Sequence, residues 1–143
     1  IAGYNCSFMN IDDPRAFDEM MYILMNGTGV GFSVERQHIS KLPRVPDRFT
    51  KSDIPIVVQD SKQGWAEAYR ELISELYEGI IRPWDTSLVR KAGEPLKTFG
   101  GRASGPEPLI DLFNFTIAIV KYSTYDWTNA FFQKRTQNNF DCK

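Results

Sequence analysis

One cysteine near the start of the chain is the residue best suited to chemistry. Cys6 stands in the strand-like run Tyr4-Asn5-Cys6-Ser7-Phe8-Met9. A thiol at a strand end can give up electrons and form a disulfide, so it could serve in redox chemistry. The alternative interpretation is a buried cysteine that packs as a small hydrophobe. The residue types alone leave both interpretations open.

A glycine-rich run follows about twenty residues later, at Gly27-Thr28-Gly29-Val30-Gly31. Glycine lets backbone N–H groups approach a phosphate or a sugar closely, which invites a nucleotide-loop interpretation. The dinucleotide fingerprint, however, needs a strand, then the glycine loop, then a helix. Here the glycines follow a predicted helix and open a predicted strand. The alternative is therefore a helix C-cap with a tight strand entry.

The second glycine-rich run extends from Phe99 to Pro106, and its Arg102 could form a fork around a phosphate. The alternative is a connection before a helix. His38 is more often a loop residue than a catalytic base. With one histidine and two cysteines, no zinc-ligand spacing is matched, so we expect no metal site. The remaining candidates are interpreted as caps, turn residues or solvated charges: Asp60, Asp85 and Asp111.

The elements that would position Cys6 form a β-α-β unit. Asp13 followed by Pro14 marks a helix start, and Asn26-Gly27 ends the apolar period, which predicts a helix over residues 14–25. Apolar side chains then alternate over residues 30–34, as in a strand. A parallel pair with a right-handed crossover is expected.

Further along the chain, three prolines between residues 40 and 55 predict an irregular connection. We expect a short strand at 56–58, then a helix capped at Asp60-Ser61 and ending at Gly79. Residues 80–108 predict loops with a short strand near 87–89. A third helix should start near Pro106 and run through Val120. Beyond Lys121 no clear period remains.

The composition limits the possible function classes. The 143 residues have the length of one domain, and 17 Lys+Arg against 18 Asp+Glu give a net charge of −1. That balance disfavours nucleic acid or an anionic membrane as a partner. No apolar run approaches the roughly 18 residues of a membrane span. Only Cys6 and Cys142 are present, and no secretory signal precedes them, so a reducing cytoplasm is expected.

Three separate strings carry a resemblance to a known family: YNCSFMNIDDPRAFDEMMYILMNGTGVGFSVERQHISKLP, VVQDSKQGWAEAYRELI and LKTFGGRASGPEPL. Together they resemble the catalytic chain of ribonucleotide reductases. The best match is the adenosylcobalamin-dependent (class II) branch, of the monomeric type that reduces ribonucleoside triphosphates. The similarity covers about residues 3 to 120. It implies a partial catalytic barrel over 1–121 and an unmatched tail over 122–143.

The resemblance implies an α/β fold, a fragment of a ten-stranded α/β barrel. In the family a thiyl radical, generated through adenosylcobalamin, abstracts the ribose 3′-hydrogen, and a cysteine pair then reduces the 2′-carbon. Cys6 matches the first cysteine of that pair, Asn5 would lie against the substrate ribose, and Gly29 would let the backbone approach the substrate. The implied partners are a ribonucleoside triphosphate and a thioredoxin-type reductant. The cobalamin-binding residues are expected outside this chain.

Two further regions resemble regulatory parts of the family. Asp13 and the loop from Val34 to Arg36 resemble the site where a deoxynucleotide effector selects the base that is reduced. Residues of about 45–95 resemble an insertion with which the monomeric branch imitates a partner subunit's helix. The GGRASGP string is a family hallmark, interpreted as a structural loop.

The radical-bearing cysteine, the second cysteine of the pair and a catalytic glutamate lie downstream in the family and have no match here. Cys142 is not assigned as the partner of Cys6. We therefore expect a chain that begins inside a strand, at Ile1, and is a piece of a reductase, inactive and marginally stable without the remainder. The alternatives are a split-gene subunit that needs a second chain, a non-catalytic nucleotide-binding remnant, and a non-reductase α/β protein that shares only the fold.

Overall fold

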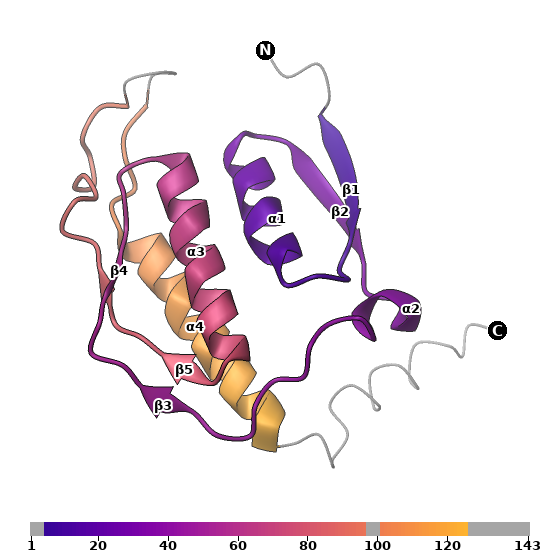
Figure 1. Ribbon diagram of the computed structural model, residues 1–143. Coiled ribbons are helices and arrows are strands. Elements are labelled where there is room, and N and C mark those ends of the chain that lie inside the picture. The colour runs from indigo at the N-terminus through magenta and orange to yellow at the C-terminus, as the bar shows by residue number, and fades with distance from the viewer. Residues whose placement is uncertain (1–4, 97–100, 126–143) are drawn as a thin grey trace.

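The computed structural model describes residues 5–96 and 101–125. Strand β1 (Cys6–Asn10), helix α1 (Arg15–Met25) and strand β2 (Gly29–Ser33) come first along the chain. The two strands pair in parallel, in a register that runs from Cys6 opposite Gly29 to Asn10 opposite Ser33. The predicted β-α-β unit is therefore confirmed. In Figure 1 this unit occupies one side of the molecule, with α1 between the two strands and helix α3 (Lys62–Tyr77).

Helix α1 begins at Arg15, one residue later than predicted, with Pro14 as its N-cap residue, and the Asp13 carboxylate just before it accepts from the first turn. Its Oδ1 accepts a hydrogen bond from the Arg15 N–H at 2.8 Å, which satisfies one of the unpaired donors of the first turn. At the other end the N–H groups of Asn26 and Gly27 donate to carbonyls of the last turn, and Gly27 adopts a left-handed φ of 82°. The predicted C-cap is thus confirmed.

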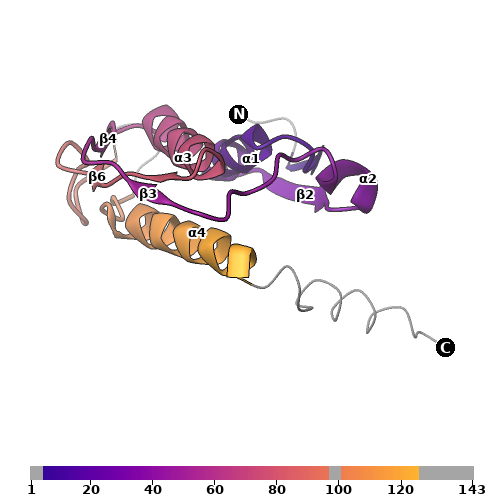
Figure 2. The same cartoon turned by 60° about the horizontal axis from the view of Figure 1, so that its bottom comes forward.

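Helix α2 (Arg36–Ile39) follows β2 and lies beside the end of the strand pair in Figure 1. Most of the remaining described chain forms a second layered unit. Besides α3, its elements are β3 (Thr50–Lys51), β4 (Ile56–Val57), β5 (Ile80–Ile81), β6 (Trp84–Asp85) and α4 (Glu107–Tyr125). Strand β3 pairs with β5 and β4 with β6, both in parallel, so α3 is the crossover for both pairs. Figure 2 shows α3 on one side of these short strands and α4 on the other.

Two predictions for this unit need correction. The connection over residues 40–55 is not wholly irregular, since it contains β3, and α2 precedes it. The strand expected near 87–89 is wrong, and the strand lies earlier, at Trp84–Asp85. The Asp85 carboxylate accepts from the Ser87 N–H at 2.9 Å and the Val89 N–H donates to the Thr86 carbonyl, which turns the chain there.

Helix α3 begins where its sequence predicts, because the Ser61 hydroxyl accepts from the Gly64 N–H at 2.9 Å. Asp60, the other predicted cap, instead pairs with Arg90 at 2.8 Å. Gly64 itself is required by packing. A Cβ atom there would lie 2.5 Å from the Gln59 Cβ.

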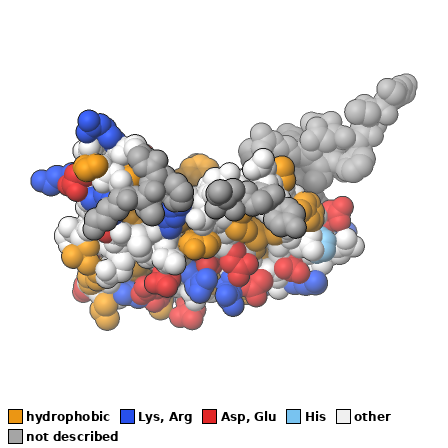
Figure 3. Space-filling view, turned by 90° about the horizontal axis from the view of Figure 1, so that it is seen from above, with side chains coloured by type: hydrophobic (Ala, Val, Ile, Leu, Met, Phe, Trp, Pro, Cys, Tyr) orange, Lys and Arg blue, Asp and Glu red, His pale blue; other side chains and the backbone are white. Residues whose placement is uncertain are grey.

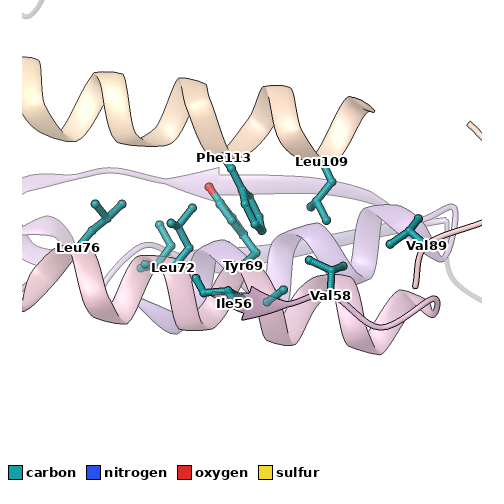
Figure 4. Packing of buried hydrophobic residues seen from close by; sticks show 10 residues of the cluster. Ile56, Val58, Tyr69, Leu72, Leu76, Val89, Leu109 and Phe113 are labelled. Carbon is teal, nitrogen blue, oxygen red and sulfur yellow. The ribbon is translucent and has the colours of Figure 1, made fainter. Parts of the chain in front are cut away.

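The hydrophobic core lies between α3 and α4. Leu72 and Leu76 of α3 are fully buried, as are Leu109 and Phe113 of α4. Figure 4 shows these side chains pointing toward one another, together with those of Ile56, Val58, Tyr69 and Val89. Each fully buried aliphatic or aromatic side chain contributes about 1.5–3 kcal/mol through the area it removes from water. The apolar periods predicted for the second and third helices thus mark this core.

The described residues hold three two-stranded parallel sheets, which agrees with an α/β fragment. A ten-stranded barrel is not confirmed by them. The division into 1–121 and 122–143, with an insertion at about 45–95, stays a prediction, although α4 continues past Lys121 to Tyr125. Tyr4, Phe99, Gly100 and Cys142 lie outside the described residues.

Candidate functional site

The paired amino ends of β1 and β2 bring together three residues singled out from the sequence. Cys6 lies directly opposite Gly29 in the parallel register. The Gly29 N–H donates to the Asn5 carbonyl at 3.0 Å, and the Ser7 hydroxyl donates to the Gly29 carbonyl at 3.2 Å. Asn5, Cys6 and Gly29 are therefore held in one place by the strand pairing. Their proposed roles stay predictions.

The thiol of Cys6 is exposed and free. The interpretation of Cys6 as a buried small hydrophobe is therefore wrong for the described part of the chain. Side chains alternate between the faces of a strand, and Ser7, Met9 and Val30 on the other face are half-buried. Figure 1 shows α1 packed along one face of the strand pair. Cys6 thus belongs to the face that points away from the helix, where a ligand can reach the sulfur.

Strand β2 presents bare backbone beside the thiol. Gly29 and Gly31 lie opposite Cys6 and Phe8, on the same face of the strand pair. A Cβ at Gly29 would lie 3.5 Å from the Asn5 carbonyl oxygen, an ordinary van der Waals distance. The described fold therefore has room for a side chain at position 29. Packing within the described residues therefore does not require a glycine at position 29, and its predicted substrate contact stays a prediction.

The N–H groups of the glycine run do not form a phosphate cradle. Those of Gly27 and Thr28 donate to carbonyls of α1, and that of Gly29 donates to Asn5. A phosphate would have to replace these bonds. The helix C-cap interpretation is therefore the one that the geometry supports, and any role of Gly29 rests on its missing side chain.

The two predicted effector residues lie at the opposite end of the strand pair. Asp13 follows the carboxyl end of β1 and caps α1, and Arg36 opens α2 after β2. Both side chains are exposed. At about 3.3 Å per residue, β1 spans about 13 Å from Cys6 to Asn10, and Asp13 and Arg36 lie beyond that end. The structure thus divides the five candidate residues into two groups, one at each end.

An ion pair that the sequence did not predict lies at this carboxyl end of the strand pair. Lys41 Nζ lies 3.2 Å from Asp12 Oδ2 and joins the segment after α2 to the end of β1. His38 of α2 is mostly buried, and its Nδ1 has no hydrogen-bond partner. The adjacent acidic residues Asp12 and Asp13 could have suggested a site for a basic partner, but nothing in the sequence identified Lys41 as that partner.

Among the remaining sequence candidates, Arg102 and Asp85 have structural partners. The Arg102 guanidinium donates to the Gly93 carbonyl at 2.9 Å beside the antiparallel bridge of Pro95 with Arg102, and a phosphate fork is not the arrangement observed. Hydrogen bonds from Ser87 hold the pKa of the Asp85 carboxyl below its usual value. Asp111 is an exposed residue of α4. Within residues 5–96 and 101–125, no group of three or more His, Cys, Asp or Glu side chains is arranged to hold a metal ion.

A buried ion pair attaches the β-α-β unit to α3. Asp18 of α1 is 1% exposed, and its Oδ2 accepts from Arg70 Nε at 2.8 Å and from Nη2 at 2.7 Å. The hydrogen bond that Arg70 donates to the Asp18 carboxylate raises the pKa of Arg70. Sequence reasoning treated Asp18 only as a first-turn acid that suits the helix dipole. Its burial beside α3 could not be read from α1 alone.

Charged side chains elsewhere are mixed. Figure 3 shows acidic and basic side chains interspersed along one edge of the face it draws.

Between α1, α3 and α4 lies an apolar hollow of about 240 Å³, lined by residues such as Phe17, Tyr77 and Phe115. No helix among the described residues is both long enough and apolar enough to cross a membrane.

Comparison with known proteins gives one consistent answer. The chain is 32% identical over 114 residues to an adenosylcobalamin-dependent ribonucleoside-triphosphate reductase of Euglena gracilis, a match that spans 76% of this chain and 15% of that protein. A reductase of the same description from Lactobacillus leichmannii is 31% identical over 135 residues, with 67% and 17% covered. A putative one from Mycobacterium phage D29 is 51% identical over 57 residues, with 37% and 8% covered. No family model matches the chain.

A solved structure agrees at the level of the fold. The crystal structure of a B12-dependent (class II) ribonucleotide reductase superposes with a TM-score of 0.73 at 24% identity, and the match covers 83% of this chain and 24% of that one. The chain thus spans less than a fifth of the length of the curated relatives named above. The resemblance seen in the sequence is confirmed, and it concerns one part of those proteins.

Proposed function

We propose that this chain, whose curated homologues are adenosylcobalamin-dependent ribonucleoside-triphosphate reductases, supplies the first redox cysteine and part of the substrate and effector sites of such an enzyme. One observation carries the proposal. The Cys6 thiol is exposed on the helix-free face of β1, directly opposite a glycine whose side-chain position is left open. A ribose lying on this bare backbone would have its carbons beside the sulfur.

The chemistry of Cys6 is that of one thiol in a reducing pair. Two thiols together release two electrons and two protons as they become a disulfide. These replace the 2′-hydroxyl of the ribose by hydrogen, with the oxygen leaving as water. Cys6 would donate the proton to the departing hydroxyl. The second thiol would come from the remainder of the reductase, and a thioredoxin-type dithiol would reduce the disulfide again. Such a cycle requires a reducing compartment, which we propose is the cytoplasm.

Adenosylcobalamin would supply the radical that starts the reaction when it is bound. The described residues do not fit a site for it. The ring of His38 is mostly buried beside Glu35, and the apolar hollow offers no ligand for cobalt. We therefore assign the cofactor no residue of this chain.

The far end of the strand pair would take the deoxynucleotide effector. Asp13 and Arg36 are exposed there and carry opposite charges, which suits the sugar hydroxyls and phosphates of a nucleotide. The Asp13 carboxylate also caps α1, so an effector bound to it would contact the helix behind the Cys6 strand.

The proposal is tested in two assays. The purified 143-residue chain, given a ribonucleoside triphosphate, adenosylcobalamin and a dithiol, should form no deoxynucleotide. Turnover by the chain alone would overturn its assignment as one part of the enzyme.

The second assay replaces the matching segment of the Lactobacillus leichmannii reductase by this chain's residues 5–120. Deoxynucleotide formation by the chimera should be lost on Cys6→Ser and kept on Phe32→Ala, because Phe32 pairs with Met9 on the opposite face of the strand pair. Full activity of the Cys6→Ser chimera would show that the thiol has no part in the reduction.

A further inference from the structure

An exposed aromatic ring shares the open face with the Cys6 thiol. Phe8 follows Cys6 by two residues on β1, so both side chains leave the strand on the same side, about 6.6 Å apart along it. Phe8 is 69% exposed, among the largest exposed fractions of any apolar side chain in the described residues. A ring of this size in water costs free energy that a bound partner would recover.

The opposite strand is shaped to receive this ring. Gly31 is the register partner of Phe8, and a Cβ built there would lie 3.3 Å from the Phe8 Cδ2 atom, closer than most such contacts. The ring therefore lies across the glycine backbone, in a position that a side chain at residue 31 would disturb. Together with Gly29 this leaves a strip without side chains, which runs from the thiol to the ring.

We propose that Phe8 is a substrate-binding residue whose ring stacks against the nucleobase while the ribose lies beside Cys6. This inference rests on the proposed function, because it takes the ribose to lie at the thiol. The group next to Phe8 is then one that adjoins the ribose, either the base or the triphosphate. An uncharged aromatic surface favours the base, since every nucleobase offers a π-face and a triphosphate offers only charge.

The strand pair supplies a matched control. Phe32 of β2 is 53% exposed, similar to Phe8, but it pairs with Met9 and so belongs to the opposite face. Replacing Phe32 removes a similar ring from the same two strands without changing the face that holds Cys6. Because both rings are largely exposed, neither replacement should unfold the chain.

The experiment follows alkylation of Cys6 in the full chain by N-ethylmaleimide, read by peptide mass spectrometry so that Cys142 is scored separately. Guanosine triphosphate should slow labelling of Cys6, and tripolyphosphate, which lacks the base, should not. In Phe8→Ala the nucleotide concentration for half-protection should rise about tenfold, a change that corresponds to about 1.4 kcal/mol of stacking. Phe8→Tyr and Phe32→Ala should protect like the unsubstituted chain.

Equal protection in Phe8→Ala and the unsubstituted chain would overturn the role of Phe8 and leave the proposed function standing. Absence of nucleotide protection in the unsubstituted chain, or equal protection by tripolyphosphate, would also overturn it. Failure of the proposed function would be recognised by a different result, namely deoxynucleotide formation by the Cys6→Ser chimera. Circular dichroism of Phe8→Ala checks that lost protection is not lost folding, and Phe8→Leu, which keeps an apolar side chain but removes the ring, should lose protection in the same way.

Discussion

The ion pair between Asp18 and Arg70 attaches the β-α-β unit to α3. Loss of the Arg70 side chain should therefore weaken this attachment strongly. In Arg70→Ala the Asp18 carboxylate, 1% exposed, would lose both donors to its Oδ2. Leaving a buried charge without its partner costs about 3–5 kcal/mol. Arg70 itself is 46% exposed, and water screens that half of the pair, so we expect about 2 kcal/mol.

The assay is urea unfolding, followed by far-ultraviolet circular dichroism and by tryptophan fluorescence. With a slope near 2 kcal/mol/M, a loss of about 2 kcal/mol lowers the midpoint by about 1 M. Arg15→Ala, on the helix that carries Asp18, is the control. Arg15 and Glu19 form a largely exposed pair at 3.5 Å, which should contribute only about 0.3 kcal/mol.

The double variant Asp18→Leu/Arg70→Leu separates the charge effect from packing. Removing both charged groups together leaves no unpaired charge, so the double variant should be more stable than Arg70→Ala. If Arg70→Ala costs no more than Arg15→Ala, or if the double variant is the less stable of the two, the reasoning about the buried carboxylate is refuted.

Three further predictions concern the helices and the core. Ser61→Ala should lower the free energy of unfolding by about 1 kcal/mol because it removes the cap of α3; an unchanged urea midpoint would contradict this. Phe113→Ala should cost about 3–5 kcal/mol, since the ring is fully buried, and calorimetry would show whether the melting temperature falls accordingly. Burial raises the pKa of the Tyr69 phenol above its ordinary 10.0. The unfolded chain therefore loses that proton first, so stability should be complete below pH 10 and fall as the pH rises further; Tyr69→Phe should reduce that fall in urea titrations.

The sequence predicted the three long helices because their signals are local. Ser61 caps α3, Asp13 caps α1, and Gly27 ends it, and each acts within one turn of its own position. Strands β3 and β5 were missed, and β6 was expected a few residues too late, because a two-residue strand exists only through its partner. Thr50 pairs with Ile80 and Trp84 with Ile56, contacts about thirty residues apart in the chain.

The candidate site shows the same division. The resemblance pointed to Asn5, Cys6 and Gly29 as residues of one site, and the strand register places them together. The exposure of Cys6 depends on which face of β1 is turned toward α1, and no property of the cysteine itself decides that. The sequence left a phosphate-binding role open for Arg102, and only the structure shows that its guanidinium donates to the Gly93 carbonyl.

By itself the sequence determined that this is an α/β chain related to the cobalamin-dependent reductases, because helix periods, caps and the three family strings depend only on residue order. The tertiary structure decided which side chains are available for chemistry. Burial and pairing are properties of two segments in contact. Packing of α1 against α3 buries Asp18 and pairs it with Arg70, while Cys6 and Phe8 are exposed on the face of β1 that points away from α1. Phe8 and Phe32 are the same residue type and are both largely exposed. Only the strand register shows that they lie on opposite faces of the strand pair.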